Sequence, residues 1–253
     1  MGEHIVVKSM ETIEKMAESS RIVAETLQLL RDMVKPGIST LELDRAAYEY
    51  ILKKGGKPSF LGYHGFPGTI CASINEEVVH GIPSADRILK DGDIVSIDIG
   101  VYKNGYHGDA AITVPAGKVN LAVKRLLEVT EEALECGIAQ AVAGNKLYDI
   151  SAAVQRHAEE HGYSIVRDYV GHGIGKIVHE PPMIPNFGKA GTGPEIKAGH
   201  VFAIEPMVNM GRYQVKTLKD KWTVVTSDGK LSAHFEHTVA ILEKGNRILT
   251  KLS

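Results

Sequence analysis

The sequence predicts a single α+β domain built from two similar halves around an antiparallel-rich sheet. In each half, helical patterns come before strand patterns instead of alternating with them, which favours this class over a doubly wound fold. The segment KDGDIVSID ends at Asp98, and KAGHVFAIE repeats its pattern and ends 107 residues later at Glu205. Segments beginning at Leu41 and Leu147 match at an offset of 106 residues. Such self-similarity indicates two copies, over about residues 11–115 and 120–245, within one domain of residues 1–253.

The first copy opens with two predicted helices. Apolar residues recur at helical spacing from Glu11 to Met33, before the helix-ending Pro36-Gly37 pair. Ser39-Thr40-Leu41-Glu42 matches a capping box, so a second helix begins there and ends at Gly55-Gly56. Strands are expected over about residues 69–74 and 94–102.

The second copy repeats this order. Helices are expected over about residues 122–141 and 147–160. Five β-branched or aromatic segments then predict strands: IVRDYV, VFAIEP, QVKTL, WTVVT and HFEHTVAIL. No low-complexity linker separates the copies, so they are expected to share one sheet and one core.

Two aspartates stand in the predicted hairpin SIDIGVYKNGYHGDAA. With Asn104-Gly105 in a two-residue turn, Asp109 lies opposite Gly100, and Asp98 lies opposite Ala111. Because side chains alternate along a strand, both carboxylates then point to one face as diagonal neighbours. Exposed edge acids are the simpler alternative, but apolar flanking residues favour two acids that share a cation.

Further candidate ligands stand on other predicted strands. His172 lies between glycines in VGHGIG, which does not match the dinucleotide fingerprint. Glu205 ends an apolar strand at the repeat position of Asp98. Alternation places Glu236 on one face with His234 and Thr238. Taken singly, six further histidines predict no ligand; these are His80, His107, His157, His161, His179 and His200.

Four carboxylates and one imidazole form an oxygen-rich ligand set. Structural zinc prefers Cys and His, so this composition favours Mn, Fe(II), Co or a catalytic Zn. Bridging carboxylates can hold two such ions, an arrangement that serves hydrolysis.

In this order and with their surrounding motifs, the five residues resemble the metal ligands of the type I methionine aminopeptidases. The matching motifs include KPGISTLELD, SINEEVVHGIP, DGDIVSIDIGVYKNGYHGD, YVGHGIGKIVHEPP, IEPMVN, DKWTVVTSDGK and AHFEHTVAI. The resemblance implies the pita-bread (creatinase/aminopeptidase-like) fold, in which helices pack on a curved sheet. It also implies removal of the initiator methionine from nascent polypeptides.

The resemblance implies a role for each matched residue. Asp98 would bind one of two divalent ions, Asp109 and Glu236 would bridge both, and His172 and Glu205 would bind the other. A hydroxide bridging the metals would attack the first peptide carbonyl, with Glu205 handling the proton. His179 would contact the scissile amide or carbonyl, and His80 would assist at the leaving nitrogen.

The implied methionine pocket is formed by Tyr63, Phe66, Cys71 and Trp222; core packing is the simpler explanation for each alone. Four positions depart from better-known members. Phe60 stands where cysteine is often found, Phe66 replaces a common tyrosine, and Val178 replaces a common phenylalanine. Gly100 replaces a threonine seen in some members. These departures leave all ligands in place and concern the shape of the pocket.

The composition indicates where in the cell the protein is found and which classes of partner it does not favour. A net charge of −2 gives no electrostatic footprint for nucleic acid or an anionic membrane. Two distant cysteines and an N-terminus without an apolar signal core favour a reducing, cytoplasmic location. By resemblance, a monomer that meets nascent polypeptides near the ribosome is expected.

Two other functions fit the same ligands. A proline-specific aminopeptidase or dipeptidase shares them, but normally carries a further N-terminal domain, and the first copy here is expected to begin near residue 11. A peptide-binding relative without catalysis usually lacks some ligands, whereas all five stand here.

Overall fold

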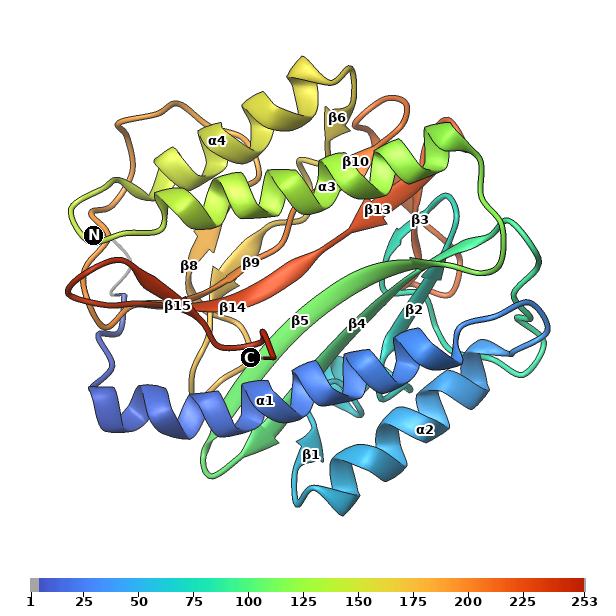
Figure 1. The fold of residues 1–253 in the computed structure, drawn as a ribbon, viewed down its shortest axis with the longest axis horizontal. Helices are drawn as coiled ribbons and strands as arrows, with labels where there is room; N and C mark the ends of the chain where they lie inside the picture. Colours follow the sequence, from blue (N-terminus) through green and yellow to red (C-terminus); the bar gives the residue numbers. More distant parts are fainter. Residues whose placement is uncertain (1–4, 253) are drawn as a thin grey trace.

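The computed structural model describes residues 5–252, in which four α-helices lie against one face of a curved sheet (Figure 1). Two helices belong to each half. They are α1 (Met10–Met33), α2 (Thr40–Lys53), α3 (Leu121–Gln140) and α4 (Leu147–Glu160). In Figure 1 the pair α1 and α2 lies below and the pair α3 and α4 above. A 3₁₀ turn covers Tyr63–Gly65.

The main sheet has nine strands, in the order β1-β4-β5-β14-β9-β7-β8, with β2 also on β4 and β15 also on β14. Its strands are β1 (Lys57–Pro58), β2 (Cys71–Ile74), β4 (Ile94–Lys103), β5 (Tyr106–Pro115), β7 (Gly171–Gly173), β8 (Glu180–Ile184), β9 (Val201–Ile204), β14 (Glu236–Ile241) and β15 (Asn246–Ile248). Two three-stranded sheets flank it, in the orders β13-β10-β6 and β11-β12-β3. Their strands are β3 (Glu77–Val79), β6 (Ser164–Ile165), β10 (Met207–Asn209), β11 (Val215–Thr217), β12 (Val224–Thr226) and β13 (Ser232–His234).

The register predicted for the β4–β5 hairpin is confirmed. Asp98 pairs with Ala111 and Gly100 pairs with Asp109, while Lys103 pairs with Tyr106 across the Asn104-Gly105 turn. Alternation then divides the residues of both strands between two faces. Odd-numbered apolar residues of β4 such as Ile97 join the core beneath the helices, so the even-numbered ones, including Asp98, face the other side.

Elements of the two halves keep the offset seen in the sequence. Helix α4 begins 107 residues after α2, and β9 begins 107 residues after β4. Figure 1 shows the two helix pairs on opposite halves of the same sheet. These positions support the internal repeat, although its origin by duplication stays a prediction.

Two predicted strands differ from the structure. The strand expected over residues 165–170 keeps only Ser164–Ile165, because Val166 makes the last bond to Met207 O, at 3.1 Å. The following residues leave the sheet, and Asp168, Tyr169 and Val170 line a pocket. The strand expected over 234–242 is split at Phe235, whose N–H donates to Pro206 O instead of extending a ladder, at 3.3 Å.

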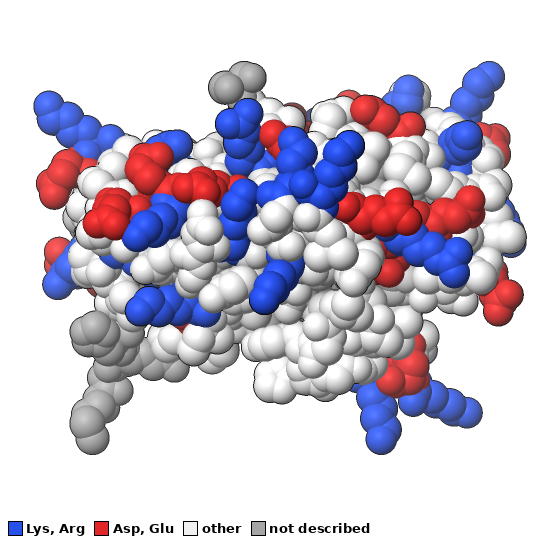
Figure 2. All heavy atoms as spheres, turned by 90° about the horizontal axis from the view of Figure 1, so that it is seen from below, with Lys and Arg blue, Asp and Glu red and all other residues white. Residues whose placement is uncertain are grey.

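The surface carries mixed charge. Figure 2 shows Lys and Arg side chains interspersed with Asp and Glu on the face seen from below. Cys71 and Cys136 are both free thiols. No helix within residues 5–252 has the length and apolarity required to cross a bilayer.

Candidate metal centre

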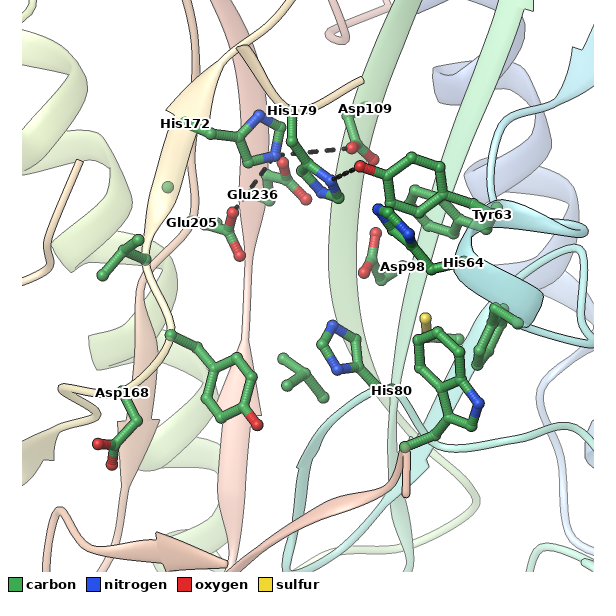
Figure 3. Close-up of a pocket in the computed structure, with 18 of the residues that line it drawn as sticks. Tyr63, His64, His80, Asp98, Asp109, Asp168, His172, His179, Glu205 and Glu236 are labelled. Atoms are coloured by element: carbon green, nitrogen blue, oxygen red, sulfur yellow. Dashed lines mark hydrogen bonds and ion pairs between the residues drawn. The ribbon is translucent and has the colours of Figure 1, made fainter. Parts of the chain in front are cut away.

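The five candidate ligands come from five neighbouring strands. The sheet order β4-β5-β14-β9-β7 carries Asp98, Asp109, Glu236, Glu205 directly after β9, and His172. Ala111 pairs with Asp98 on one side and with Glu236 on the other, which sets these two acids in one row across the sheet. Figure 3 shows all five side chains turned toward a common space.

The side chains lie within reach of shared ions. Donor atoms of Asp109, His172 and Glu236 all lie within 4.8 Å of one another. The Nε2 atom of His172 lies 3.6 Å from Glu205 Oε1 and 3.9 Å from Asp109 Oδ2. Asp109 and Glu236 are each only 2% exposed. This is a dense group of acids in a place where water can stabilise little of their charge.

Burial and mutual repulsion raise the carboxyl pKa values. Burial raises the pKa of Asp98 to about 7, and the Glu205 charge adds to this while His234 opposes it. Burial and the charges of Asp98 and Glu205 raise the pKa of Asp109 well above its usual range. Burial also raises the pKa of Glu205 and of Glu236. A cation would relieve this repulsion.

Buried polar atoms without hydrogen-bond partners also indicate a cation site. Within residues 5–252, Asp98 Oδ1, Asp109 Oδ1 and Glu236 Oε1 are buried without a hydrogen-bond partner. Buried polar atoms normally have partners. Together with the oxygen-rich donor set, these atoms fit one or more divalent cations.

His172 is oriented as a ligand. Its Nδ1 lies 2.8 Å from the carbonyl oxygen of Gly173, so Nδ1–H donates to that oxygen. The lone pair of Nε2 then faces the acids, which is the arrangement typical of a metal-bound imidazole. Burial lowers the pKa of His172 to about 3, so the ring is neutral at pH 7.

His179 and His80 lie beside the acids from opposite directions (Figure 3). The hydroxyl of Tyr63 lies 2.9 Å from His179 Nδ1, and burial raises the pKa of this tyrosine, so the hydroxyl can donate and leave Nε2–H free. His80 adopts φ 60, a rare backbone conformation for a residue with a side chain. Burial lowers the pKa of His80 to about 4, which keeps its ring neutral.

An apolar cluster closes one side of the same pocket, whose volume is about 440 Å³. Its buried members are Phe60, Phe66, Cys71 and Val178, with Tyr63, Ile82 and Trp222 packed against them. Phe66 and Trp222 meet edge to face, with centroids 5.1 Å apart. Burial and the Asp98 charge raise the pKa of Cys71, so its thiol stays neutral.

All site residues predicted from the sequence therefore line one pocket. The sequence did not assign a role to His234, whose Nε2 is buried without a hydrogen bond and lies 3.6 Å from Glu205 Oε2. The predicted alternation did place His234 on the face of Glu236. Only the cross-sheet position of Glu205, which no local pattern contains, brings this histidine to the acids. Tyr169 and His64 also line the pocket unpredicted.

Comparison with known proteins agrees with this geometry. A family profile described as "Metallopeptidase family M24" matches residues 14–243. The chain belongs to metallopeptidase family M24. M24 enzymes are metallopeptidases, which agrees with a buried cluster of acids that fits divalent cations.

Curated M24 relatives match almost the whole chain. A methionine aminopeptidase of Clostridium perfringens is 54% identical over 246 residues, covering 97% of this chain and 98% of its own. Methionine aminopeptidase 1 of Bacillus subtilis is 55% identical over 248 residues, covering 98% of this chain and all of its own length.

Solved structures confirm the predicted fold class. Methionine aminopeptidase from Thermotoga maritima superposes with a TM-score of 0.97 at 43% identity, covering 98% of this chain and 100% of that one. A prolidase from Pyrococcus furiosus has a TM-score of 0.78 at 23% identity, covering 98% of this chain and 66% of its own, which supports the shared fold alone. The α+β pita-bread fold of the M24 enzymes is thus the fold of this chain.

Proposed function

We propose that this protein removes the N-terminal methionine from newly made polypeptides with the help of two divalent metal ions. The observation that carries the proposal is the position of the apolar cluster directly beside the acids. Cys71 of that cluster pairs with Asp98 across β2 and β4. A methionine side chain in the apolar cluster would hold the first peptide bond next to the acids. The 54–55% identity to proteins named methionine aminopeptidase supports the same substrate.

Five residues would hold the ions. Asp98 would hold one ion, Asp109 and Glu236 would be shared by both, and His172 and Glu205 would hold the other. Mn, Fe(II), Co and Zn all suit this donor set. When bound, the ions supply an activated water and polarise the scissile carbonyl.

The remaining side chains position the substrate and move protons. Glu205 would take up a proton during the reaction, a role favoured by burial, which raises its pKa. The Nε2–H of His179, held by Tyr63, would donate to the scissile group and stabilise developing charge. Neutral His80 would assist at the leaving nitrogen. The methionine side chain would pack on Tyr63, Phe66, Cys71 and Trp222.

Several finer points of the function are also proposals. The enzyme would act as a monomer in the cytoplasm, near the ribosome, where nascent N-termini emerge. It would prefer a small residue after methionine, as the resemblance to methionine aminopeptidases suggests.

Hydrolysis of short peptides tests the substrate. We expect release of methionine from a Met-Gly peptide after addition of Mn, Fe(II) or Co, and little cleavage of a Xaa-Pro peptide. Faster cleavage before proline would instead indicate a proline-specific aminopeptidase. Binding of Met-Gly without turnover under any metal would indicate a peptide-binding protein.

The Asp109→Ala variant tests the ligand set. Loss of a bridging carboxylate should reduce metal content from two ions and abolish hydrolysis, while the circular dichroism spectrum stays that of the wild type. Wild-type turnover by this variant would overturn the assignment of Asp109.

A further inference from the structure

A second group of metal-ligating side chains lies away from the pocket, on the helical layer. Glu132 and Cys136 stand one turn apart on α3, and His157 and His161 stand one turn apart at the end of α4. Residues four apart share a helix face. Figure 1 shows α3 and α4 side by side, so the two pairs can face each other.

The distances between these side chains suit a metal ion. Glu132 Oε2 lies 3.0 Å from His157 Nε2. One donor atom each of Glu132, His157 and His161 lies within 4.8 Å of the others. Ligand atoms around tetrahedral zinc, each about 2.0–2.1 Å from the ion, lie about 3.3 Å apart. Glu132 and His157 are half-buried and His161 is exposed, so small rotations of these side chains would complete the site.

Both imidazole rings are held by a second contact. His161 Nδ1 lies 2.8 Å from the carbonyl oxygen of His157, so Nδ1–H donates and Nε2 keeps its lone pair. His157 Nδ1 lies 3.7 Å from the sulfur of Cys136. In the tautomer with the proton on Nδ1, this nitrogen donates to sulfur and frees Nε2 for an ion. Such contacts orient metal-bound histidines.

Close packing of the two helices brings the groups together. A Cβ atom at Gly137, next to Cys136, would lie only 2.7 Å from a methyl group of Val154 on α4. Glycine at this position therefore permits the close approach. Arg125 lies 3.7 Å from Glu132 Oε1 and leaves Oε2 directed at His157.

We propose that Glu132, His157 and His161 bind one divalent transition-metal ion, with zinc as the expected ion, and that this ion ties α3 to α4. One carboxylate and two imidazoles are a donor set that zinc accepts, with water completing its coordination. The site is separate from the pocket, which lies beyond the sheet. A plain ion pair between Glu132 and His157 is the alternative, and it would give His161 no role.

Zinc binding to the metal-free protein tests the proposal. The measurements are calorimetric titration with ZnCl₂ at about pH 7.5, since zinc binds the neutral form of imidazole, and metal content after gel filtration. The Asp109→Ala background lowers binding in the pocket. In that background, His161→Gln and Glu132→Gln should each bind one equivalent of zinc less than the parent. Glu159→Gln, an exposed change on α4, should match the parent.

Thermal unfolding gives an independent result. Zinc should raise the melting temperature of the Asp109→Ala protein, and His161→Gln should make this rise smaller while leaving the metal-free melting temperature unchanged. Cys136→Ala should keep the extra equivalent with affinity reduced about 10–100-fold, because sulfur supports the ring without binding the ion. Equal zinc content in the parent and His161→Gln, or loss of the equivalent in Cys136→Ala, would overturn the three-ligand site.

Discussion

Phe60 and Gly100, two positions that depart from better-known relatives, touch each other. A Cβ atom at Gly100 would lie 2.9 Å from Phe60 Cε1 and 2.8 Å from Ser59 Cβ. Gly100 also pairs with Asp109. Ser59 and Phe60 together therefore occupy the space that a side chain at position 100 would take. Because Phe60 lines the pocket, its tight packing against Gly100 helps to fix the pocket wall.

This contact predicts coupled substitutions. Gly100→Ala should lower the free energy of unfolding by about 1–3 kcal/mol, because it overfills a packed site. Phe60→Leu should reduce that cost, since it withdraws the ring from the added methyl group. Urea unfolding of the wild type, both single variants and the double variant measures the coupling. Strictly additive changes would show that the two side chains do not compete for this space.

Thr238 joins strands β5 and β14 at the candidate metal centre. The backbone pairing between these strands covers only Glu236 with Ala111 and His237 with Ala110. Beyond it, Thr238 Oγ1 accepts from Asp109 N–H at 3.0 Å and donates to Asp109 C=O at 2.7 Å. One hydroxyl thus replaces the next ladder bonds and fixes the backbone of a proposed ligand.

Removal of this hydroxyl should weaken both stability and metal binding. Thr238→Val keeps the shape but leaves two buried backbone groups unpaired, at about 1–3 kcal/mol for each group. The proposed affinity for Mn should fall about 10–100-fold, as for other groups that hold ligands in place. Thermal unfolding and metal titration test this, and Thr238→Ser should retain most of both properties. Wild-type metal affinity in Thr238→Val would assign the positioning of Asp109 to other contacts.

The features of the candidate metal centre that depend on neighbouring residues could be predicted from the sequence. The features that depend on pairing between separate segments could not. Asn104-Gly105 fixes the register of a hairpin, so the convergence of Asp98 and Asp109 could be predicted from neighbouring residues alone. The place of β14 beside β5 could not, because it depends on pairing between segments more than a hundred residues apart. The proximity of His234 to Glu205 had no local signal either, because His234 ends β13 and Glu205 follows β9, and only the tertiary fold brings these two segments together. The residues after Ile165 have high strand propensity, so the sequence predicts a strand there. In the structure Asp168, Tyr169 and Val170 line the pocket instead.

His200 couples the stability of the whole molecule to pH. Its ring is 2% exposed, and Nδ1 accepts from the N–H of Lys197 at 3.2 Å. Burial, with the charges of Lys8 and Lys197, lowers its pKa from 6.5 to about 4. As pH falls below 6.5, His200 binds a proton in the unfolded chain. In the folded protein it does not bind one until about pH 4. The stability that neutral His200 contributes is therefore complete above the unfolded pKa of 6.5, and it is lost as pH falls toward the folded pKa of about 4.

His200→Asn should therefore flatten the pH dependence of unfolding, since the amide oxygen can still accept from Lys197 and does not titrate. Between about pH 7.5 and pH 5 the wild type should lose more stability than the variant. Each kcal/mol of that difference corresponds to about 2–4 °C in melting temperature for a chain of this size. Parallel curves for the two proteins would show that His200 does not contribute. The comparison cancels the other buried histidines, which are the same in both.

Lys8, near the start of the chain, contacts residues of the second half of the molecule. Lys8 N–H donates to Gly199 O at 2.7 Å, and its Nζ lies 3.1 Å from Glu180 Oε2. Both side chains are buried, with 6% and 10% of their surfaces exposed. Glu180 directly follows His179, so a residue near the start of the chain holds the segment that carries a proposed catalytic group.

Lys8→Met should cost about 3–5 kcal/mol, because it leaves the Glu180 carboxylate without its cationic partner in a poorly hydrated place. Its melting temperature should fall, and hydrolysis at a temperature where the protein remains folded should show a lower kcat, since the His179 segment is less firmly held. The double variant Lys8→Met/Glu180→Met should regain most of the stability, because an apolar pair removes the unpaired charge. If the double variant is as unstable as the single one, the loss comes from packing around Lys8 and not from the charge of Glu180. If it regains stability but not kcat, the ion pair serves chiefly to fix the position of His179, which is the role its location beside the pocket predicts.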